Sequence, residues 1–268
     1  MRTRLLGSLA LLAGLAAMTQ ATLVYAIDHR NGIRFVTFDT LAPGAQTVLG
    51  TGITAGYFGL DFDAAASNLY AARLTSGVAF VDRLSLANGS TLASTPIIGT
   101  GTESITGLTI DAANNAYLST VGATSNLWTI NVATGATTLI GSMGTNLVID
   151  ISIDSAGRMV AHDISTDSFH FVNTSTGALT LIGPHGLAAN FAQGMDFDWS
   201  NNVLYAAVYT GGGTLTYGSV SLANGAVTPI PGILSGEYEM AVQSAVPEPA
   251  TLTALSLGAL ALLRRRKR

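Results

Sequence analysis

Hydrophobic and polar positions along the chain alternate in short runs instead of following the period of a helix. In the segment LWTINV, which begins at Leu127, the side chains of Trp128, Ile130 and Val132 share one face, while Leu127 points to the other. Similar runs, separated by turn residues, recur over residues 22–245. This pattern predicts an all-β chain of many short strands.

Two longer patterns repeat along these runs. The first is an apolar–polar–apolar–Asp run, then a small polar turn, then a second apolar run, as in GLDFDAAASNLYAARL from Gly59 and GMDFDWSNNVLYAAVY from Gly194. Two further copies begin at Gly107 and Asp150. The second pattern is a hairpin signal with a turn glycine, found at Gly44, Gly89, Gly135, Gly177 and Gly225, spaced 45, 46, 42 and 48 residues apart. Glycine suits tight hairpins because it adopts a positive φ without steric cost.

The length of the repeat predicts the architecture. A period in the forties with several short strands per unit is typical of the blades of a β-propeller. Each unit contains four predicted strands, a to d from the centre outwards. The body starts with LVYAIDHRNG, which matches strand b, and it ends with GEYEMAVQS, which matches strand a alone. We therefore predict five blades, with one blade built from N-terminal strands and a C-terminal strand. The alternative is a β-sandwich, although sandwiches rarely keep so regular a period.

The start of the chain has the layout of a secretory signal peptide over residues 1–21. Arg2 and Arg4 precede an apolar run over residues 5–17, and a Thr19-x-Ala21 site follows. The run is too short to cross a bilayer comfortably, which argues against a membrane helix. We therefore expect export through the general secretory route.

The charge distribution excludes several classes of function. The body between the two end segments contains no lysine and five arginines, while it holds nearly all of the 16 acidic residues of the chain. An acidic surface repels phosphate backbones, so we expect no nucleic-acid partner. The chain has no cysteine, which excludes disulfides, thiolate metal sites and a cysteine nucleophile.

Four aspartates share one repeat position, directly before the predicted turn between strands a and b: Asp63, Asp111, Asp154 and Asp198. An aspartate there accepts hydrogen bonds from backbone amides two residues further on. Four equivalent copies favour this structural role over an active site. A ring of carboxylates that binds Ca²⁺ is the alternative, but it needs six to eight oxygens within one small sphere.

Asp61 and Asp196 share a second repeat position, where the other units carry Thr109 and Ser152. Strand a is innermost in a propeller, so we expect both carboxylates near the central channel. A buried carboxylate is costly unless it is paired. Either amides of the neighbouring blade or a bound ligand or ion must therefore satisfy them.

Carboxylates around a channel also raise a catalytic hypothesis. Paired carboxylates carry out glycoside hydrolysis, and some five-bladed propellers are glycosidases, which is an analogy of fold alone. Asp61 and Asp196 are the weak candidates here, and the closing strand offers Glu239, or Glu237, as a third acid. Nothing in the sequence marks that third acid, so we predict no defined catalytic set.

No other motif points to a reaction or to a cofactor. The histidines are scattered at positions without zinc-ligand spacing: His29, His162, His170 and His185. The chain has no G-x-S-x-G motif, and a body without lysine has no phosphate-binding P-loop. We predict neither a metal nor a cofactor. Exposed aromatic rings can stack on sugars, whereas buried ones belong to the core, and five aromatics flank predicted loops: Tyr57, Phe58, Trp199, Tyr209 and Tyr217.

The chain ends with VPEPATLTALSLGALALLRRRKR, which combines three features. These are the motif Pro247-Glu248-Pro249, an apolar run over residues 251–263, and a basic cluster that includes Arg264, Arg265 and Arg266. A helix of this run would span about 20 Å, short of a hydrocarbon core of about 30 Å. The basic cluster favours a position of this end of the chain on the cytoplasmic side of the membrane. An ordinary C-terminal anchor is the alternative to a sorting segment.

The three-part order resembles the PEP-CTERM sorting signal of Gram-negative bacteria. The resemblance implies recognition by an exosortase, which is a membrane-bound cysteine protease-transpeptidase, and cleavage near the PEP motif. The body segment LWTINVATGATTLIG, from Leu127, is also similar to repeats of uncharacterised PEP-CTERM proteins. That family implies a propeller-like extracellular domain and supplies no agreed activity.

Together these features predict a signal peptide over residues 1–21, a propeller over residues 22–245 and a sorting signal with a short transmembrane segment over residues 246–268. We expect a cell-surface or extracellular-matrix protein that contacts the inner membrane only transiently, during processing. We expect a non-enzymatic binding module for exopolysaccharide or a matrix protein. A secreted carbohydrate-active hydrolase and a passive spacer are the alternatives.

Overall fold

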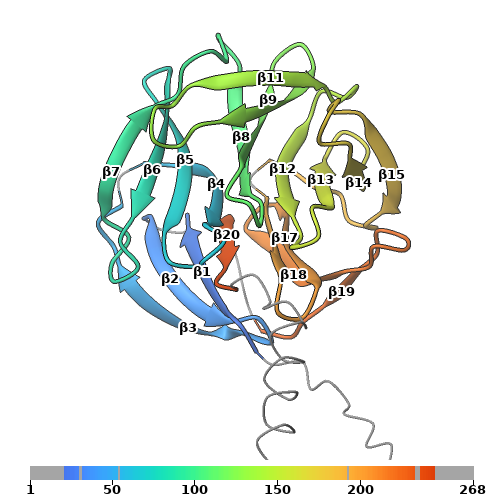
Figure 1. Cartoon of the computed structure of the whole chain (residues 1–268). Coiled ribbons are helices and arrows are strands. Elements are labelled where there is room, and N and C mark those ends of the chain that lie inside the picture. Colours follow the sequence, from blue (N-terminus) through green and yellow to red (C-terminus); the bar gives the residue numbers. More distant parts are fainter. Residues whose placement is uncertain (1–20, 30–31, 54, 192, 233–235, 245–268) are drawn as a thin grey trace, which may run out of the picture.

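The computed structural model describes residues 21–29, 32–53, 55–191, 193–232 and 236–244. Their 20 strands form five four-stranded antiparallel sheets, which are arranged as blades around a central axis (Figure 1). The prediction of a five-bladed β-propeller is confirmed. The predicted signal peptide and apolar C-terminal helix lie outside the described residues. Within the described part, no helix is both long and apolar enough to cross a membrane.

Each blade runs from an innermost strand beside the axis to an outermost strand at the rim. Blade 1 contains β20 (Tyr238–Val242), β1 (Leu23–Asp28), β2 (Arg34–Asp39) and β3 (Ala42–Gly50). Blade 2 contains β4 (Tyr57–Phe62), β5 (Leu69–Thr75), β6 (Val78–Leu84) and β7 (Thr91–Pro96). Blade 3 contains β8 (Ser104–Ile110), β9 (Ala116–Val121), β10 (Ser125–Ile130) and β11 (Thr137–Ser142). Blade 4 contains β12 (Val148–Ile153), β13 (Met159–Asp163), β14 (Ser168–Val172) and β15 (Leu179–Pro184). Blade 5 contains β16 (Gly194–Asp198), β17 (Val203–Gly211), β18 (Thr214–Val220) and β19 (Val227–Pro229).

Blade 1 closes the ring with strands from both ends of the described chain. Strand β20 pairs antiparallel with β1, in a register that places Val242 opposite Val24 and Tyr238 opposite Asp28. The three other strands of this sheet come from the N-terminal side, as the order of the repeats predicts. Closure of this kind joins the two ends of the described chain in one sheet and gives blade 1 its fourth strand.

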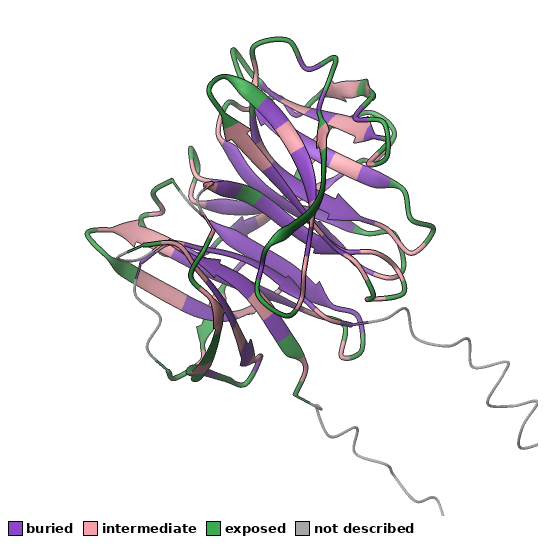
Figure 2. Cartoon of the chain, turned by 90° about the vertical axis from the view of Figure 1, so that its left-hand side faces the viewer, coloured by how far each residue is buried: buried purple, intermediate pink, exposed green. Residues whose placement is uncertain are grey.

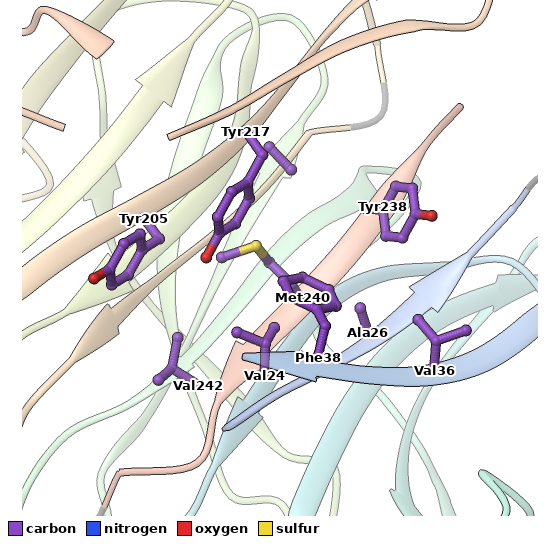
Figure 3. Packing of buried hydrophobic residues seen from close by; sticks show 10 residues of the cluster. Val24, Ala26, Val36, Phe38, Tyr205, Tyr217, Tyr238, Met240 and Val242 are labelled. Atoms are coloured by element: carbon purple, nitrogen blue, oxygen red, sulfur yellow. The ribbon is translucent and has the colours of Figure 1, made fainter. Parts of the chain in front are cut away.

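The hydrophobic core lies between the blades. Five buried clusters are present in the described part, and each joins two neighbouring blades. Figure 3 shows one of them, in which Phe38 and Met240 of blade 1 pack with Tyr205 and Tyr217 of blade 5. Inner strands are therefore buried on both faces, whereas outer strands and loops are exposed (Figure 2). Burial on both faces explains why nearly half of the residues are hydrophobic.

Four of the five predicted hairpin glycines occupy turns with a positive φ: Gly89, Gly135, Gly177 and Gly225. Gly135 shows why no other residue fits, because it has a φ of 73° and an added Cβ would strike the carbonyl oxygen of Pro96 in the next blade. The prediction for Gly44 is wrong, since Gly44 lies inside β3. In blade 1 the chain turns earlier, where the Asp39 carboxylate accepts a hydrogen bond from the amide of Leu41 at 2.8 Å.

Candidate functional site

Two sets of equivalent positions lie in the innermost strands and a third lies at or directly after their ends, at spacings of two residues along the axis. Their pairing with the second strand of each blade is the same in all five sheets. The first set is Gly59, Gly107, Asp150, Gly194 and Glu239. The second is Asp61, Thr109, Ser152, Asp196 and Ala241, and the third is Asp63, Asp111, Asp154, Asp198 and Gln243.

Asp61 uses both carboxylate oxygens to hold the neighbouring blade. Its Oδ2 accepts hydrogen bonds from the Thr109 hydroxyl at 2.8 Å and from the amide of Ile110 at 2.7 Å. Its Oδ1 accepts from the amide of Phe62, which follows it in the same strand, at 2.6 Å. Asp61 is only 5% exposed, so these bonds replace the water that the carboxylate loses.

The same arrangement continues around the ring and includes Asp196. The Ser152 hydroxyl donates to Asp196 Oδ1 at 2.8 Å, and the amide of Val242 donates to Asp196 Oδ2 at 2.7 Å. The Thr109 hydroxyl in turn accepts from the amide of Ile153 at 3.1 Å. We call the four side chains Asp61, Thr109, Ser152 and Asp196 the axial belt. Neighbouring-blade amides therefore satisfy the two carboxylates, which is one of the two possibilities that the sequence leaves open.

A third carboxylate, Asp150, makes the same kind of contact one position earlier. Its Oδ2 accepts from the amide of Met195 at 2.7 Å, and its Oδ1 accepts from the amide of Ile151 at 2.8 Å. Asp150 is 3% exposed. The repeat pattern conceals this residue because three of the five blades carry glycine at its position.

Burial raises the pKa of these carboxyl groups. Desolvation raises the pKa of Asp61 from 3.8 to about 7, although its hydrogen bonds with Ile110, Thr109 and Phe62 act in the opposite direction. Desolvation is also the largest cause for Asp150 and Asp196, whose pKa values lie well above 3.8, and the negative charge of Asp61 adds to the effect on Asp196. The hydrogen bonds of the axial belt therefore link the blades, but burial makes the ionised form of its carboxyl groups unfavourable.

The four turn aspartates each hold the turn that follows their strand. Asp63 Oδ1 accepts from the amides of Ser67 and Asn68 at 2.7 and 3.1 Å. Asp154 Oδ1 accepts from the amides of Ala156 and Arg158 at 3.0 and 2.8 Å. Asp111 and Asp198 each accept two amide hydrogen bonds in the same way. All four carboxylates are thus engaged within their own turns.

Glu239 differs from every other carboxylate near the axis. It is 4% exposed, and its Oε2 has no hydrogen-bond partner among the residues that the structure describes. Burial raises the pKa of Glu239 well above 4.5, and the negative charges of Asp150 and Glu237 raise it further. A buried oxygen without a donor is costly, and such a position is typical of a binding site.

Glu239 lies at the wall of a cavity of about 410 Å³, which we call the axial pocket. Its lining comes from inner strands and adjoining segments of blades 1 to 4 and from the segment between β15 and β16: Phe58, Leu74, Ser104, Ile105, Thr106, Val121, Ile149, Phe191, Glu237 and Glu239. A volume of this size is within the range of sites for small organic groups. The residues Ser104, Ile149 and Glu237 lie near the starts of their strands, so the pocket lies at that end of the axis.

Three β-bulges shape this pocket. The pairing register shifts between Tyr57 and Gly59, between Ile105 and Gly107, and between Val148 and Asp150. The extra residues at the three shifts are Phe58, Thr106 and Ile149, and all three line the axial pocket. Bulges commonly redirect a side chain beside a functional site. The alternation of the sequence gives no sign of them, because one extra residue does not disturb so short a run.

The five aromatics near loops divide between the core and the surface. Trp199 is 6% exposed, and its Nε1 donates to the carbonyl oxygen of Ile153 at 2.8 Å, so it belongs to the core. Tyr57 and Tyr217 are buried as well, and Tyr209 is partly buried. Phe58 is 38% exposed in the axial pocket. A further exposed ring there, Phe191, is not apparent from the sequence pattern.

Two of the histidines that are scattered in the sequence meet in the fold. His162 Nε2 and His185 Nε2 lie 3.1 Å apart, and the amide of Leu187 donates to His185 Nδ1 at 3.3 Å. Burial lowers the pKa of both imidazoles, strongly for His162. No group of three or more potential metal-ligating side chains is present within the described ranges. The pair is therefore neutral, with one ring donating to the other.

In the comparison with protein families, residues 245–268 match the PEP-CTERM protein-sorting motif. The predicted sorting residues Pro247, Glu248, Pro249, Arg264, Arg265 and Arg266 fall within this match and lie outside the described part of the structure. The chain thus carries a PEP-CTERM signal. This signal marks an exported protein that is processed by an exosortase and sorted to the cell envelope or surface.

The body of the chain is similar to solved structures in fold alone. A chain from a nidogen/laminin complex superposes with a TM-score of 0.54 at 13% identity, and the match covers 84% of this chain and 100% of that one. A protein of unknown function from Bacteroides caccae gives 0.44 at 13% identity, covering 80% and 73% of the two chains. TolB from Acinetobacter baumannii gives 0.49 at 8% identity, covering 81% and 54%. No curated protein matches the sequence.

Proposed function

We propose that the propeller is a non-catalytic binding domain that the sorting signal delivers to the cell surface or extracellular matrix. Its ligand is an exopolysaccharide or a matrix protein, and the binding site is the axial pocket. The observation that carries this proposal is Glu239, whose Oε2 has no partner among the described residues and which lines a pocket shared by blades 1 to 4 and the segment before β16. A site of this kind offers a ligand both a shaped cavity and an unsatisfied polar atom.

The arrangement of the carboxylates gives the hydrolase alternative less support. Asp61 and Asp196 are 5% and 3% exposed, and their oxygens accept hydrogen bonds from backbone amides and hydroxyls. A glycosidase needs one carboxylate at the leaving group and another at the attacked carbon, both open to the sugar. The raised pKa values follow mainly from burial, which also occurs in structural networks.

The sorting signal provides the route. The apolar run over residues 251–263 and the five basic residues that follow it hold the chain in the inner membrane with its end in the cytoplasm. Cleavage near Pro247 then releases the propeller. Membrane contact is transient, and the mature protein consists of the propeller without the basic end.

Co-sedimentation tests the proposed function directly. The protein, purified from its own host, is mixed with exopolysaccharide and, separately, with matrix proteins from that host. We expect saturable binding to one of these polymers. Binding to neither, over a range of salt concentrations, contradicts the proposal. Release of reducing sugar by the protein contradicts it as well, because it shows turnover.

A further inference from the structure

Resting on the proposed binding function, we propose that the axial pocket receives an organic cation on an alkyl stem, the size of a lysine side chain, presented by a basic matrix protein. The partner inserts this side chain along the axis until the cationic head reaches Glu239. The propeller thus recognises a protein through one buried charge at the centre of the ring.

The first support is the chemistry of Glu239. Its Oε2 is buried and lacks a donor within the described part of the chain. An ammonium group supplies several N–H donors and a positive charge, so it satisfies the oxygen and favours the ionised carboxylate. Among the described residues, the charges that raise the pKa of Glu239 are the negative charges of Asp150 and Glu237. They attract a ligand cation as well.

The second support is the wall of the pocket. Apolar side chains predominate in it, from Leu74, Ile105, Val121, Ile149 and the two phenylalanines, while Ser104 and Thr106 are its hydroxyl-bearing residues. An alkyl stem packs favourably against such a wall, whereas the many hydroxyl groups of a neutral sugar would lose water without finding partners. Phe58 and Phe191 are 38% and 58% exposed, so their rings are accessible to a passing cation.

The third support is the charge of the surroundings. Among the described residues, the lining contains two glutamates and no lysine, arginine or histidine. Three of the five body arginines are already paired with aspartates, in the pairs Arg34–Asp28, Arg73–Asp82 and Arg158–Asp154. The ring body has no lysine at all. A basic partner therefore meets complementary charge, which increases its rate of association and orients it.

The fourth support is the set of three bulges. Blades 2, 3 and 4 each place an extra residue at the same level of the innermost strand, and each extra residue lines the pocket. A bulge leaves its extra residue unpaired in the ladder, and bulges are frequent next to functional sites. The three extra residues and Glu239 from blade 1 thus line one and the same pocket.

The test measures binding of two probes by calorimetry to the protein purified from its host. The probes are n-butylammonium and a short neutral peptide with one lysine, and the control peptide has norleucine in place of lysine. We expect the lysine peptide to bind at least tenfold more tightly than the norleucine peptide. If n-butylammonium binds as tightly as the lysine peptide, the side chain alone supplies the contact. If the peptide binds more tightly than n-butylammonium, the backbone of the partner contributes as well.

Two variants assign the effect to the pocket. Glu239→Gln keeps the size and removes the charge, and we expect it to weaken binding of the lysine peptide at least tenfold. Glu103→Gln removes the same charge outside the pocket, where the carboxylate accepts from Asn126 Nδ2 at 2.7 Å, and we expect a change below twofold. Phe191→Ala changes an exposed ring without entering the core, so it tests the site if Glu239→Gln fails to fold.

The outcomes separate this inference from the proposed function. Equal binding of the lysine and norleucine peptides overturns the inference, as does lysine binding that Glu239→Gln and Phe191→Ala leave unchanged. If host polymer still co-sediments with the protein in that case, the binding function stands and its ligand is not a cation. If neither probe nor polymer binds, both proposals fail.

Discussion

Replacing Asp61 with asparagine tests the electrostatic cost of the axial belt. In the folded protein, the pKa of Asp61 is raised from 3.8 to about 7, chiefly by burial. The folded state therefore holds a proton that the unfolded chain releases between these two values. Stability that this group contributes at low pH is lost as the pH rises towards 7, because the unfolded state ionises first.

The size of the effect follows from the pKa shift. Each unit corresponds to about 1.4 kcal/mol, so the shift of Asp61 corresponds to a loss of up to about 4 kcal/mol between pH 4 and pH 8. Asparagine does not ionise, so the variant escapes this loss. The charge of Asp61 also raises the pKa of Asp196, and its removal relieves part of that cost too. Asparagine loses one carboxylate acceptor, which lowers stability by a roughly constant amount at every pH.

The assay is urea unfolding, followed by circular dichroism at several pH values from 4 to 8. The informative quantity is the difference in unfolding free energy between wild type and Asp61→Asn, since the effects of the histidines cancel in it. We expect this difference to move in favour of the variant by up to about 4 kcal/mol as the pH rises. Thr109→Val is the contrasting variant, because it keeps the Asp61 carboxyl group but removes a hydrogen bond that lowers its pKa, so its stability relative to wild type should not rise with pH. A difference that stays constant with pH, or that moves in favour of wild type, refutes the reasoning.

Four further predictions concern other parts of the chain. Gly59→Ala should lower the unfolding free energy by about 1–3 kcal/mol in urea titrations, because a Cβ there would strike the backbone nitrogen of Leu108, whereas unchanged stability would show that the strands can separate. Asp154→Ala should lower the free energy of unfolding by about 1 kcal/mol, because the turn amides of Ala156 and Arg158 then bond only to water. A melting temperature equal to that of wild type would show that the turn does not depend on the carboxylate. His162→Gln should reduce the loss of stability below about pH 6.5. Burial lowers the pKa of His162, so the unfolded chain takes up a proton before the folded protein does. An acid unfolding transition identical to that of wild type would contradict this prediction. Glu248→Ala should leave the protein in the membrane fraction at its unprocessed mass, which mass spectrometry and fractionation would detect, while normal release would show that the residue is dispensable for sorting.

The repeated pattern was enough to predict the ring. Glycine turns at a regular spacing gave the number of blades, and the incomplete units at the two ends gave the closure between β20 and β1. These features are local and recur along the chain, so one irregular copy does not change the predicted number of blades. Gly44 is the irregular copy, because the chain around Asp39 forms a different turn that the glycine spacing conceals.

The site was only partly predictable, for reasons that lie in the contacts between blades. Equivalent positions brought Asp61 and Asp196 to the axis, but their partners are amides of other repeats, such as Ile110 and Val242. From the sequence, Glu239 was only a weak candidate for a third acid. The lack of a hydrogen-bond donor at its Oε2 depends on the residues of other strands that pack around it. The bulge at Phe58 depends on strand register, which the alternation of short runs does not encode. Phe191 lies in the segment between β15 and β16, where the strand pattern predicts no position.

The most direct test of the proposed function compares wild type with Phe191→Ala and Glu239→Gln in co-sedimentation with matrix polymers of the host. Both substitutions lie in the axial pocket, and circular dichroism serves as the check that each variant is folded. We predict saturable binding by wild type, and binding weakened at least tenfold in both variants. Wild-type binding that persists unchanged in both folded variants would show that the polymer binds elsewhere, and the account of the axial pocket would be wrong.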